Sequence, residues 1–255
     1  MIALSVNLNK IALIRNSRDT TNPDVVAHAH MCIDAGADGI TVHPRPDQRH
    51  IRAQDCFDLA AAIDVEFNIE GNPATGARKS DRPGVGDYPG FMELVTAIRP
   101  AQCTLVPDGD NQLTSDHGFD LQRDGDRIAP LVEQLRGMGI RTSLFMDPDP
   151  QQIRLAAQIG ADRIELYTEA YASACKGGVR LEETFRRYVL AAEVALEEGL
   201  GLNAGHDLDL NNLPRFATIR GLQEVSIGHA LTVDAIRIGL ANAVVAYQRA
   251  LGKQG

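Results

Sequence analysis

Short apolar segments recur along the whole chain and alternate with stretches of helical periodicity. Runs of β-branched and aliphatic residues predict eight strands, at positions 2–7, 39–43, 66–70, 103–107, 142–147, 163–168, 200–206 and 225–229. The intervening segments repeat apolar residues every three or four positions, as at Leu181, Phe185 and Val189, which is the spacing of one buried helical face. Regular alternation of strands and helices predicts a parallel sheet.

Turn and capping residues mark the ends of the predicted helices. Segments 21–24 and 147–150 each place a capping side chain and a proline ahead of an apolar periodic run, at 25–33 and 153–159. Glycines, which often close helices in a left-handed conformation, predict the opposite ends at positions 36, 137, 139, 160 and 199. Segments 36–38 and 160–162 both read Gly-Ala-Asp, which suggests equivalent helix-to-strand turns.

The number of strands and the length of the chain predict the architecture. Eight strand-helix units in 255 residues fit the α/β class and one (β/α)8 TIM barrel with extra helices, a single domain over 1–255. A doubly wound open sheet is the rival, but it usually carries a glycine-rich turn after its first strand, and this chain reads Asn-Leu-Asn-Lys there. Segment 71–90 is rich in turn residues and predicts a long loop, because the strand-helix rhythm continues on both sides.

Composition and charge narrow the choice of partners. A net charge of −9 leaves no general basic surface for nucleic acid, so any phosphate must be bound locally. Only four of the 25 basic residues are lysines, and the planar fork of arginine suits phosphate. The sequence shows neither a leader nor an 18-residue apolar run, and its four cysteines form no CxxC pair. We therefore expect a cytoplasmic protein that contacts neither nucleic acid nor membrane.

Ionisable and amide side chains follow most of the predicted strands. The carboxyl ends of barrel strands open on one face, where barrel enzymes hold their active sites. The side chains expected there are Asn7, His43, Glu70, Asp108, Asp147, Glu165, His206 and His229. Several imidazoles and carboxylates around one cavity can exchange protons near neutral pH. The pattern therefore favours general acid-base catalysis.

A zinc site is the alternative interpretation of the same residues. Imidazoles and carboxylates are zinc ligands, and His43, His206, His229 and Glu70 supply four of them. However, no HxH or HExxH spacing fixes two of these ligands together. The sequence therefore favours a site without metal.

Two segments are suited to binding phosphate. At residues 228–229 the last strand meets a helix, whose free N–H groups and dipole attract anions. The second is a cluster of Arg18, Arg45, Arg49 and His50 beyond the first two strands, with a solvated loop face as the alternative. Two such places imply two phosphorylated substrates or one bisphosphate.

Several of these segments together resemble the motifs of one enzyme family. They are SVNLNKIA at 5–12, AGADGITVHPR at 35–45, NIE at 68–70, LVP at 105–107, SLFMD at 143–147, LNAGH at 202–206 and IGHA at 227–230. They span nearly the whole chain and are similar to those of the pyridoxine 5′-phosphate synthase family.

The resemblance implies a reaction and a role for each residue. Members of this family condense 1-deoxy-D-xylulose 5-phosphate with 3-amino-2-oxopropyl phosphate to pyridoxine 5′-phosphate in vitamin B6 biosynthesis, without metal or organic cofactor. By motif, His43 and Glu70 would accept protons, His206 would donate one, and Glu165 would stabilise the transition state. The amino-ketone phosphate would contact Asn7, Gly228 and His229, and the deoxyxylulose phosphate would contact Arg18, Arg45, His50 and Thr114. The polar, glycine-bounded segment 109–118 would close over both substrates.

The chain departs from the family pattern on either side of the expected site. It carries Asn9 and Lys10 after the first strand where many members have Asp-His, so we expect these two residues to contact substrate differently. Asp207 follows His206 where glycine is common, which alters the expected contact to the amino-ketone phosphate. The retained acid-base residues argue for the same reaction.

Two other functions stay open on sequence alone. One is another TIM-barrel enzyme on sugar phosphates, an aldolase or an epimerase. A Schiff-base aldolase needs a strand lysine, and only Lys10 lies near a strand end. The other is a non-catalytic phosphometabolite-binding barrel, which predicts binding without turnover.

The last predicted helix bears on assembly. Segment 231–251 carries apolar residues on more than one helical face, so one face should pack on the barrel and another on a partner. The family resemblance implies a homo-oligomer, an octamer built as a tetramer of dimers.

Overall fold

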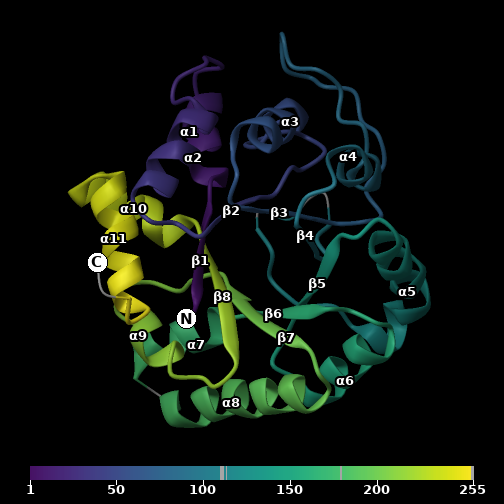
Figure 1. Ribbon diagram of the computed structural model, residues 1–255, viewed down its shortest axis with the longest axis vertical. Helices are drawn as coiled ribbons and strands as arrows, with labels where there is room; N and C mark the ends of the chain where they lie inside the picture. The colour runs from purple at the N-terminus through teal and green to yellow at the C-terminus, as the bar shows by residue number, and fades with distance from the viewer. Residues whose placement is uncertain (110–111, 113, 179, 254–255) are drawn as a thin grey trace.

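Eight parallel strands close into one barrel in the computed structural model, which describes residues 1–109, 112, 114–178 and 180–253 (Figure 1). The strands are β1 (Ala3–Asn7), β2 (Gly39–Val42), β3 (Glu66–Gly71), β4 (Gln102–Leu105), β5 (Arg141–Met146), β6 (Arg163–Tyr167), β7 (Gly201–Gly205) and β8 (Leu222–Ile227). Each strand pairs with the next along the chain, and β8 pairs with β1. The predicted (β/α)8 barrel is confirmed, and the open doubly wound sheet is excluded.

Helices surround the barrel and connect its strands (Figure 1). They are α1 (Asn9–Asn16), α2 (Val25–Asp34), α3 (Ala53–Ala62), α4 (Phe91–Ile98), α5 (Leu121–Gly137), α6 (Pro150–Gln158), α7 (Glu169–Gly177), α8 (Leu181–Glu197), α9 (Leu213–Phe216), α10 (His229–Ile238) and α11 (Leu240–Ala250). The connections after β1 and β6 and the segment after β8 each hold two helices, so the predicted extra helices are present. No helix among the described residues is long and apolar enough to cross a membrane.

The barrel wall separates an apolar layer from a polar interior. Leu4 and Val6 of β1 are buried in the apolar core shared with the helices, whereas Ser5 between them hydrogen-bonds to Thr41 of β2 at 2.6 Å. Farther round, the hydroxyl of Thr104 donates to Asn68 at 3.1 Å. Buried polar groups need such partners, so the interior is held by side-chain hydrogen bonds from strand to strand.

The two Gly-Ala-Asp segments form equivalent turns, as predicted. Asp38 accepts a hydrogen bond from the N–H of Leu4 at 2.7 Å, and Asp162 accepts one from the N–H of Thr142 at 2.8 Å. The backbone N–H groups of the two aspartates bond back to the carbonyls of the same partners, at 2.9 and 3.0 Å. Each aspartate therefore ties the beginning of one strand to the turn that enters the next.

The caps of the helices largely follow the sequence-based expectation. Asp24 accepts a hydrogen bond from the N–H of Ala27, and Asp149 accepts hydrogen bonds from two N–H groups in the first turn of α6. Glycines 36, 139, 160 and 199 adopt positive φ, as expected of left-handed caps. The prediction for Gly137 is wrong, because this residue is still part of α5.

The C-terminal region differs from the predicted single helix over 231–251. Helix α10 ends at Ile238 and α11 begins at Leu240, with Gly239 between them at φ 86° and ψ 150°. A side chain disfavours this conformation, so glycine allows the chain to turn sharply here. Strand β8 begins at Leu222 rather than Val225, because Leu222 and Glu224 already pair with Leu202 and Asn203 of β7.

The chain between β3 and α4 forms the predicted long loop. It extends outward past α3 and α4 (Figure 1). Arg78 and Tyr88 pair across it as an isolated antiparallel bridge. The buried Tyr88 hydroxyl donates to the carbonyl of Pro44 at 3.4 Å, which ties the base of the loop to the segment after β2.

Candidate active site

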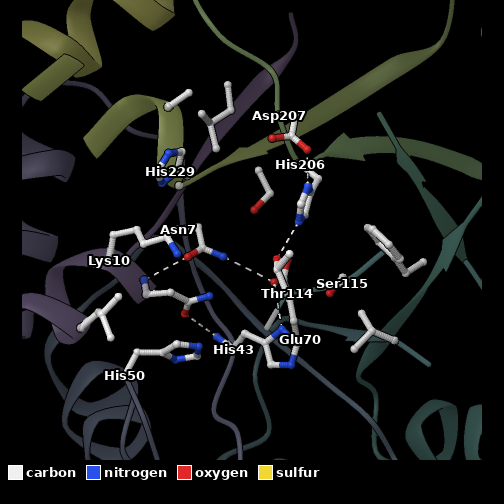
Figure 2. Close-up of a pocket in the computed structure, with 18 of the residues that line it drawn as sticks. Asn7, Lys10, His43, His50, Glu70, Thr114, Ser115, His206, Asp207 and His229 are labelled. Atoms are coloured by element: carbon white, nitrogen blue, oxygen red, sulfur yellow. Dashed lines mark hydrogen bonds and ion pairs between the residues drawn. The ribbon is translucent and has the colours of Figure 1, made fainter. Parts of the chain in front are cut away.

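A cavity of about 370 Å³ opens at the carboxyl ends of the strands (Figure 2). Its lining residues are Asn7, Asn9, Lys10, Leu13, His43, Arg45, Arg49, His50, Glu70, Val106, Thr114, Ser115, Phe145, Glu165, His206, Asp207, Leu208, Ser226, Ile227, Gly228, His229 and Ala230. Every predicted catalytic or substrate-binding residue except Arg18 lies in this set. The chain therefore brings His43, Glu70 and His206 to one pocket.

His43 and Glu70 lie together in a buried part of the cavity. Nδ1 of His43, just beyond β2, is 4.0 Å from Oε2 of Glu70 in β3. Asn7 donates to the same Glu70 oxygen at 3.4 Å and accepts the backbone N–H of Asn9 at 3.0 Å. The Asn9 side chain in turn accepts the backbone N–H of His43 at 2.9 Å. Polar contacts from β1 and α1 thus fix the position of the imidazole and the carboxyl group.

Asp108 lies beyond β4, on the other side of the His43 ring. Its Oδ2 is 3.9 Å from Nε2 of His43, forms an ion pair with Arg45, and accepts the hydroxyl of Ser115 at 2.8 Å. Arg45 also donates to the carbonyl of Gln112 at 3.0 Å. Asp108 therefore links the imidazole, the predicted phosphate-binding arginine and the loop that crosses the cavity.

Burial decides the protonation of the two central groups. Burial, and then the positive charge of Arg45, hold the pKa of His43 well below its usual value. Burial, and then the carboxylates of Glu165 and Asp108, raise the pKa of Glu70 well above its usual value. The lowered pKa favours the uncharged imidazole of His43, which offers a lone pair, and the raised pKa favours the protonated form of Glu70. Together the two groups can exchange protons with a substrate.

Glu165 projects from β6 into the interior of the barrel and is 4% exposed. Burial, and then Glu224 of β8, raise the pKa of Glu165 to about 8. Burial raises the pKa of Glu224 to about 7, although Arg163 lies 3.2 Å away. A Cβ atom at Gly205 would overlap the Glu165 carboxyl group. Glycine at this position of β7 therefore makes room for that side chain.

His206 follows β7 and lies on the opposite side of the cavity from His43 (Figure 2). Its Nδ1 is 2.7 Å from Oδ2 of Asp207, and its Nε2 is 2.9 Å from the hydroxyl of Thr114. The ring packs edge-on against Tyr167, with a centroid distance of 5.1 Å. Its side chain is 26% exposed. A second imidazole therefore faces the cavity from a more open position.

Gly228 and His229 join β8 to α10 at the rim of the cavity. Because the first N–H groups of a helix lack partners within the helix, they can bind an anion that enters here. A Cβ atom at Gly228 would lie 3.1 Å from the side chain of Asn7. Glycine therefore leaves room for the Asn7 side chain next to the backbone that follows β8.

The second predicted phosphate cluster is only partly assembled. Arg45, Arg49 and His50 line the cavity near Lys10. The buried Nδ1 of His50 accepts the N–H of Ile51 at 2.9 Å, and burial, and then Arg45, lower the pKa of His50 to about 3. Arg18 lies beyond α1, is exposed, and is not among the lining residues.

Sequence reasoning missed several residues of the pocket and its base. Ser115, Phe145 and Ser226 line the cavity, and Glu224 contacts Arg163 below it. A predicted strand that began at Leu222 would have placed Glu224 and Ser226 on one face of β8, because alternate residues of a strand share one face. Asp147 was expected at the mouth, but it accepts the N–H of Gly118 at 3.1 Å and does not line the cavity.

Comparisons with solved structures agree with the barrel. A structure titled "Native KDPGal structure" is similar with a TM-score of 0.54 and 11% identity, over 97% of this chain and 93% of that chain. A designed cube-shaped protein cage matches with a TM-score of 0.57 and 11% identity, over 98% of this chain and 72% of its own. At such low identity the similarity shows the fold alone.

Sequence comparisons go further than the fold. The family model described as "Pyridoxal phosphate biosynthesis protein PdxJ" matches residues 4–253. Pyridoxine 5′-phosphate synthase of Xanthomonas axonopodis pv. citri (strain 306) is 53% identical, over 96% of this chain and 94% of its own length. The enzyme of the same name from Albidiferax ferrireducens is 46% identical, over 98% of this chain and 97% of its own length. Since these matches span the barrel and every strand end that forms the cavity, the chain belongs to the pyridoxine 5′-phosphate synthase family.

Proposed function

We propose that the whole chain works as one catalytic domain that condenses 1-deoxy-D-xylulose 5-phosphate with 3-amino-2-oxopropyl phosphate to pyridoxine 5′-phosphate, with release of inorganic phosphate and water. The family match supports this reaction over an aldolase, an epimerase or a non-catalytic barrel. The observation that carries the proposal is the buried pair of His43 and Glu70, 4.0 Å apart in a cavity that Arg45 and Gly228 also line.

The first proposed step is proton removal by His43. Because this imidazole is uncharged in the buried cavity, it can accept a proton from the bound amino ketone or from an intermediate. Glu70 lies beside it and exchanges protons in turn, accepting once its own proton has been lost. Imine formation, loss of water and ring closure each make or break a bond with the help of proton transfer, so acid-base residues can promote them and the proposal includes neither a metal nor an organic cofactor.

Glu165 and His206 act in the later steps of this proposal. When the carboxyl group of Glu165 is ionised, it stabilises positive charge that develops on the intermediate. The raised pKa of Glu165 lets this carboxyl group gain or lose a proton near neutral pH. His206 donates a proton to the oxygen that leaves as water. Its Nε2 faces the cavity beside Thr114, as this role needs (Figure 2).

The two phosphates bind at opposite sides of the acid-base residues. The amino-ketone phosphate contacts Asn7, Gly228 and His229, next to the N-terminus of α10. The deoxyxylulose phosphate contacts Asn9, Lys10, Arg45, His50 and Thr114. Lys10 supplies a positive charge on this side. Arg18 has no place in this arrangement within one chain, because its side chain is exposed outside the cavity.

The segment 109–118 closes the cavity over the substrates in this proposal. Residues 110, 111 and 113 lie outside the described part of the chain. Among the described ones, Thr114 contacts His206, Ser115 contacts Asp108, and the carbonyl of Gln112 accepts hydrogen bonds from Arg45 and Arg49. These contacts cross from one side of the cavity to the other, as a lid needs to do to exclude water.

The proposed assembly is a homo-octamer, a tetramer of dimers, in the cytoplasm. Helices α1 and α10 pack together and leave Ile14, Ile236 and Ile238 exposed, with Ile236 77% exposed. Exposed apolar side chains on neighbouring helices suit a protein interface, and a second copy of the chain is the proposed partner. A light-scattering mass of a single chain would contradict the assembly. Ile236→Asp should lower the mass of the wild-type oligomer.

Product formation from both phosphates tests the reaction itself. Purified protein should yield pyridoxine 5′-phosphate, and His43→Asn and Glu70→Gln should each lower kcat by about 10²- to 10⁴-fold, the usual contribution of a general acid or base. Glu133→Gln, on an exposed position of α5, is the matched control and should leave kcat unchanged. If the parent forms no product, or if both active-site variants behave like the parent, the proposal is wrong.

A further inference from the structure

The turn after β7 places the side chains of His206 and Asp207 in contact, and the proposed function gives Asp207 no role. Oδ2 of Asp207 lies 2.7 Å from Nδ1 of His206. The two residues have φ values of 76° for His206 and 58° for Asp207. Asp tolerates this left-handed region better than most residues with a side chain. The backbone of the turn therefore places a carboxylate directly beside the proposed proton donor.

Hydrogen bonds from two other elements hold this turn in position. The side chain of Asn212 donates to the carbonyl of Asp207 at 3.1 Å. The hydroxyl of Thr168 lies 2.9 Å from the carbonyl of Gly205 and also contacts the carbonyl of His206. Edge-on packing against Tyr167 then limits rotation of the His206 ring. Nδ1 therefore faces Asp207 while Nε2 faces Thr114 and the cavity (Figure 2).

We propose that Asp207 is a positioning residue, whose carboxylate accepts the Nδ1 proton of His206 and so holds the ring with Nε2 toward the substrate. The inference rests on the proposed role of His206 as proton donor. In the donating step the C–O bond of the substrate breaks, and the oxygen keeps the electron pair, takes the Nε2 proton of the imidazolium and leaves as water. A proton on the neighbouring carbon passes to the proposed base His43, so that a C=C bond forms. The Nδ1 proton stays on the ring, bonded to Asp207, and the neutral ring regains an Nε2 proton from solvent.

The charge of Asp207 fits this role better than direct contact with a phosphate. Its hydrogen bond with His206 is the main cause that lowers the pKa of Asp207, so the carboxyl group is ionised. Lys176 of α7 and His229 of α10 are the other positive groups that act on it. An ionised carboxylate repels phosphate but stabilises an imidazolium. We therefore assign the side chain of Asp207 to His206.

Asp207→Asn tests the assignment, because an amide reverses the hydrogen bond. The NH2 group of asparagine can donate to Nδ1, which shifts the neutral ring to the tautomer with its proton on Nε2. Nitrogen-15 NMR of the side chains should show Nδ1–H for His206 in the parent and Nε2–H in the variant. His206→Asn identifies the signal by its loss. We expect kcat to fall by about 10- to 100-fold, with KM changed by less than about threefold.

Two further variants keep the test decisive. In Asp207→Gly the new glycine suits the left-handed turn but lacks the carboxylate. This variant should lower kcat as Asp207→Asn does, and should leave the His206 ring as a mixture of tautomers. It replaces Asp207→Asn in the test if that variant fails to fold. Asp126→Asn, on an exposed position of α5, is the control and should change neither the tautomer of His206 nor kcat. If the tautomer and kcat of the Asp207 variants match those of the parent while His206→Asn loses activity, the role of Asp207 is wrong and the proposed function stands. If His206→Asn also retains activity, the proposed donor role fails as well.

Discussion

The two imidazoles of the cavity, His43 and His206, occupy opposite surroundings. His43 is almost fully buried, between the Glu70 and Asp108 carboxyl groups and beside Arg45. The side chain of His206 is 26% exposed and pairs with Asp207, which is 34% exposed. Burial lowers the pKa of His43, whereas a carboxylate partner contacts one ring nitrogen of His206. The comparison teaches that one pocket can hold one imidazole away from water and another beside solvent, as the proposed acceptor and donor roles require.

The largest effect should come from removing the carboxylate on the buried side. Asp108→Ala removes the carboxylate that forms an ion pair with the buried Arg45, and we expect the free energy of unfolding to fall by about 3–5 kcal/mol. Asp207→Gly breaks the more exposed pair and should cost less than about 1 kcal/mol. Urea denaturation of both variants and the parent measures the difference. Equal losses for the two variants would remove the distinction between the buried side and the open side.

Gly205→Ala should have the next largest effect. The added methyl group would overlap the Glu165 carboxyl group, so that side chain must move away from its position in the barrel. We expect kcat to fall by about 10- to 100-fold, since small displacements of a reacting group are costly. Steady-state kinetics measure this loss. Gly125→Ala is the control, because nothing lies near a Cβ at that position of α5. Unchanged kcat in Gly205→Ala would mean that the position of Glu165 is unimportant.

Glu165→Gln should change the pH dependence of stability. The pKa of Glu165 is raised from 4.5 to about 8, so between these values the folded protein holds a proton that the unfolded chain has released. This group therefore lowers the free energy of unfolding as pH rises through that window, by at most about 1.4 kcal/mol per pH unit. Glutamine removes the effect. Urea midpoints at pH 5.5 and 7.5 should differ less in the variant than in the parent, and an equal difference would refute the raised pKa.

The smallest effect should come from Thr114→Val on the open side. Valine keeps the shape of threonine but loses the hydroxyl that contacts Nε2 of His206 at 2.9 Å. Because this contact is exposed to water, we expect a change in kcat/KM of only about threefold to tenfold. A loss as large as that of Glu70→Gln would show that the lid contact matters as much as the buried pair.

Much of the fold follows from patterns that are local in the sequence. The strands were predicted because apolar runs alternate with helical periodicity, and His43, Glu70 and His206 were assigned to one face because each comes at a strand end. The break at Gly239 was missed, because glycine inside a periodic run reads as part of the helix. Glu224 was missed, because a charged residue argues against a buried strand until its partner Arg163 is known.

The finer geometry of the site depends on contacts that no sequence pattern records. The bond between His206 and Asp207 requires two consecutive residues at positive φ. The link from Asp108 to Ser115 depends on the path of a loop. Arg18 was placed in the site by motif, yet it is exposed outside the cavity of the single chain. Motifs thus identify chemical types, whereas hydrogen-bond partners emerge only from the folded backbone.

The matching bonds of Asp38 and Asp162 have a consequence for how this protein can change. Both lie where strands begin, at the rim farthest from the cavity, and they set the alignment of β1 with β2 and of β5 with β6. Exchanging Lys10 at the other rim leaves that alignment intact. Substitutions around the substrate can therefore accumulate one at a time during evolution, while the alignment of these strands stays the same.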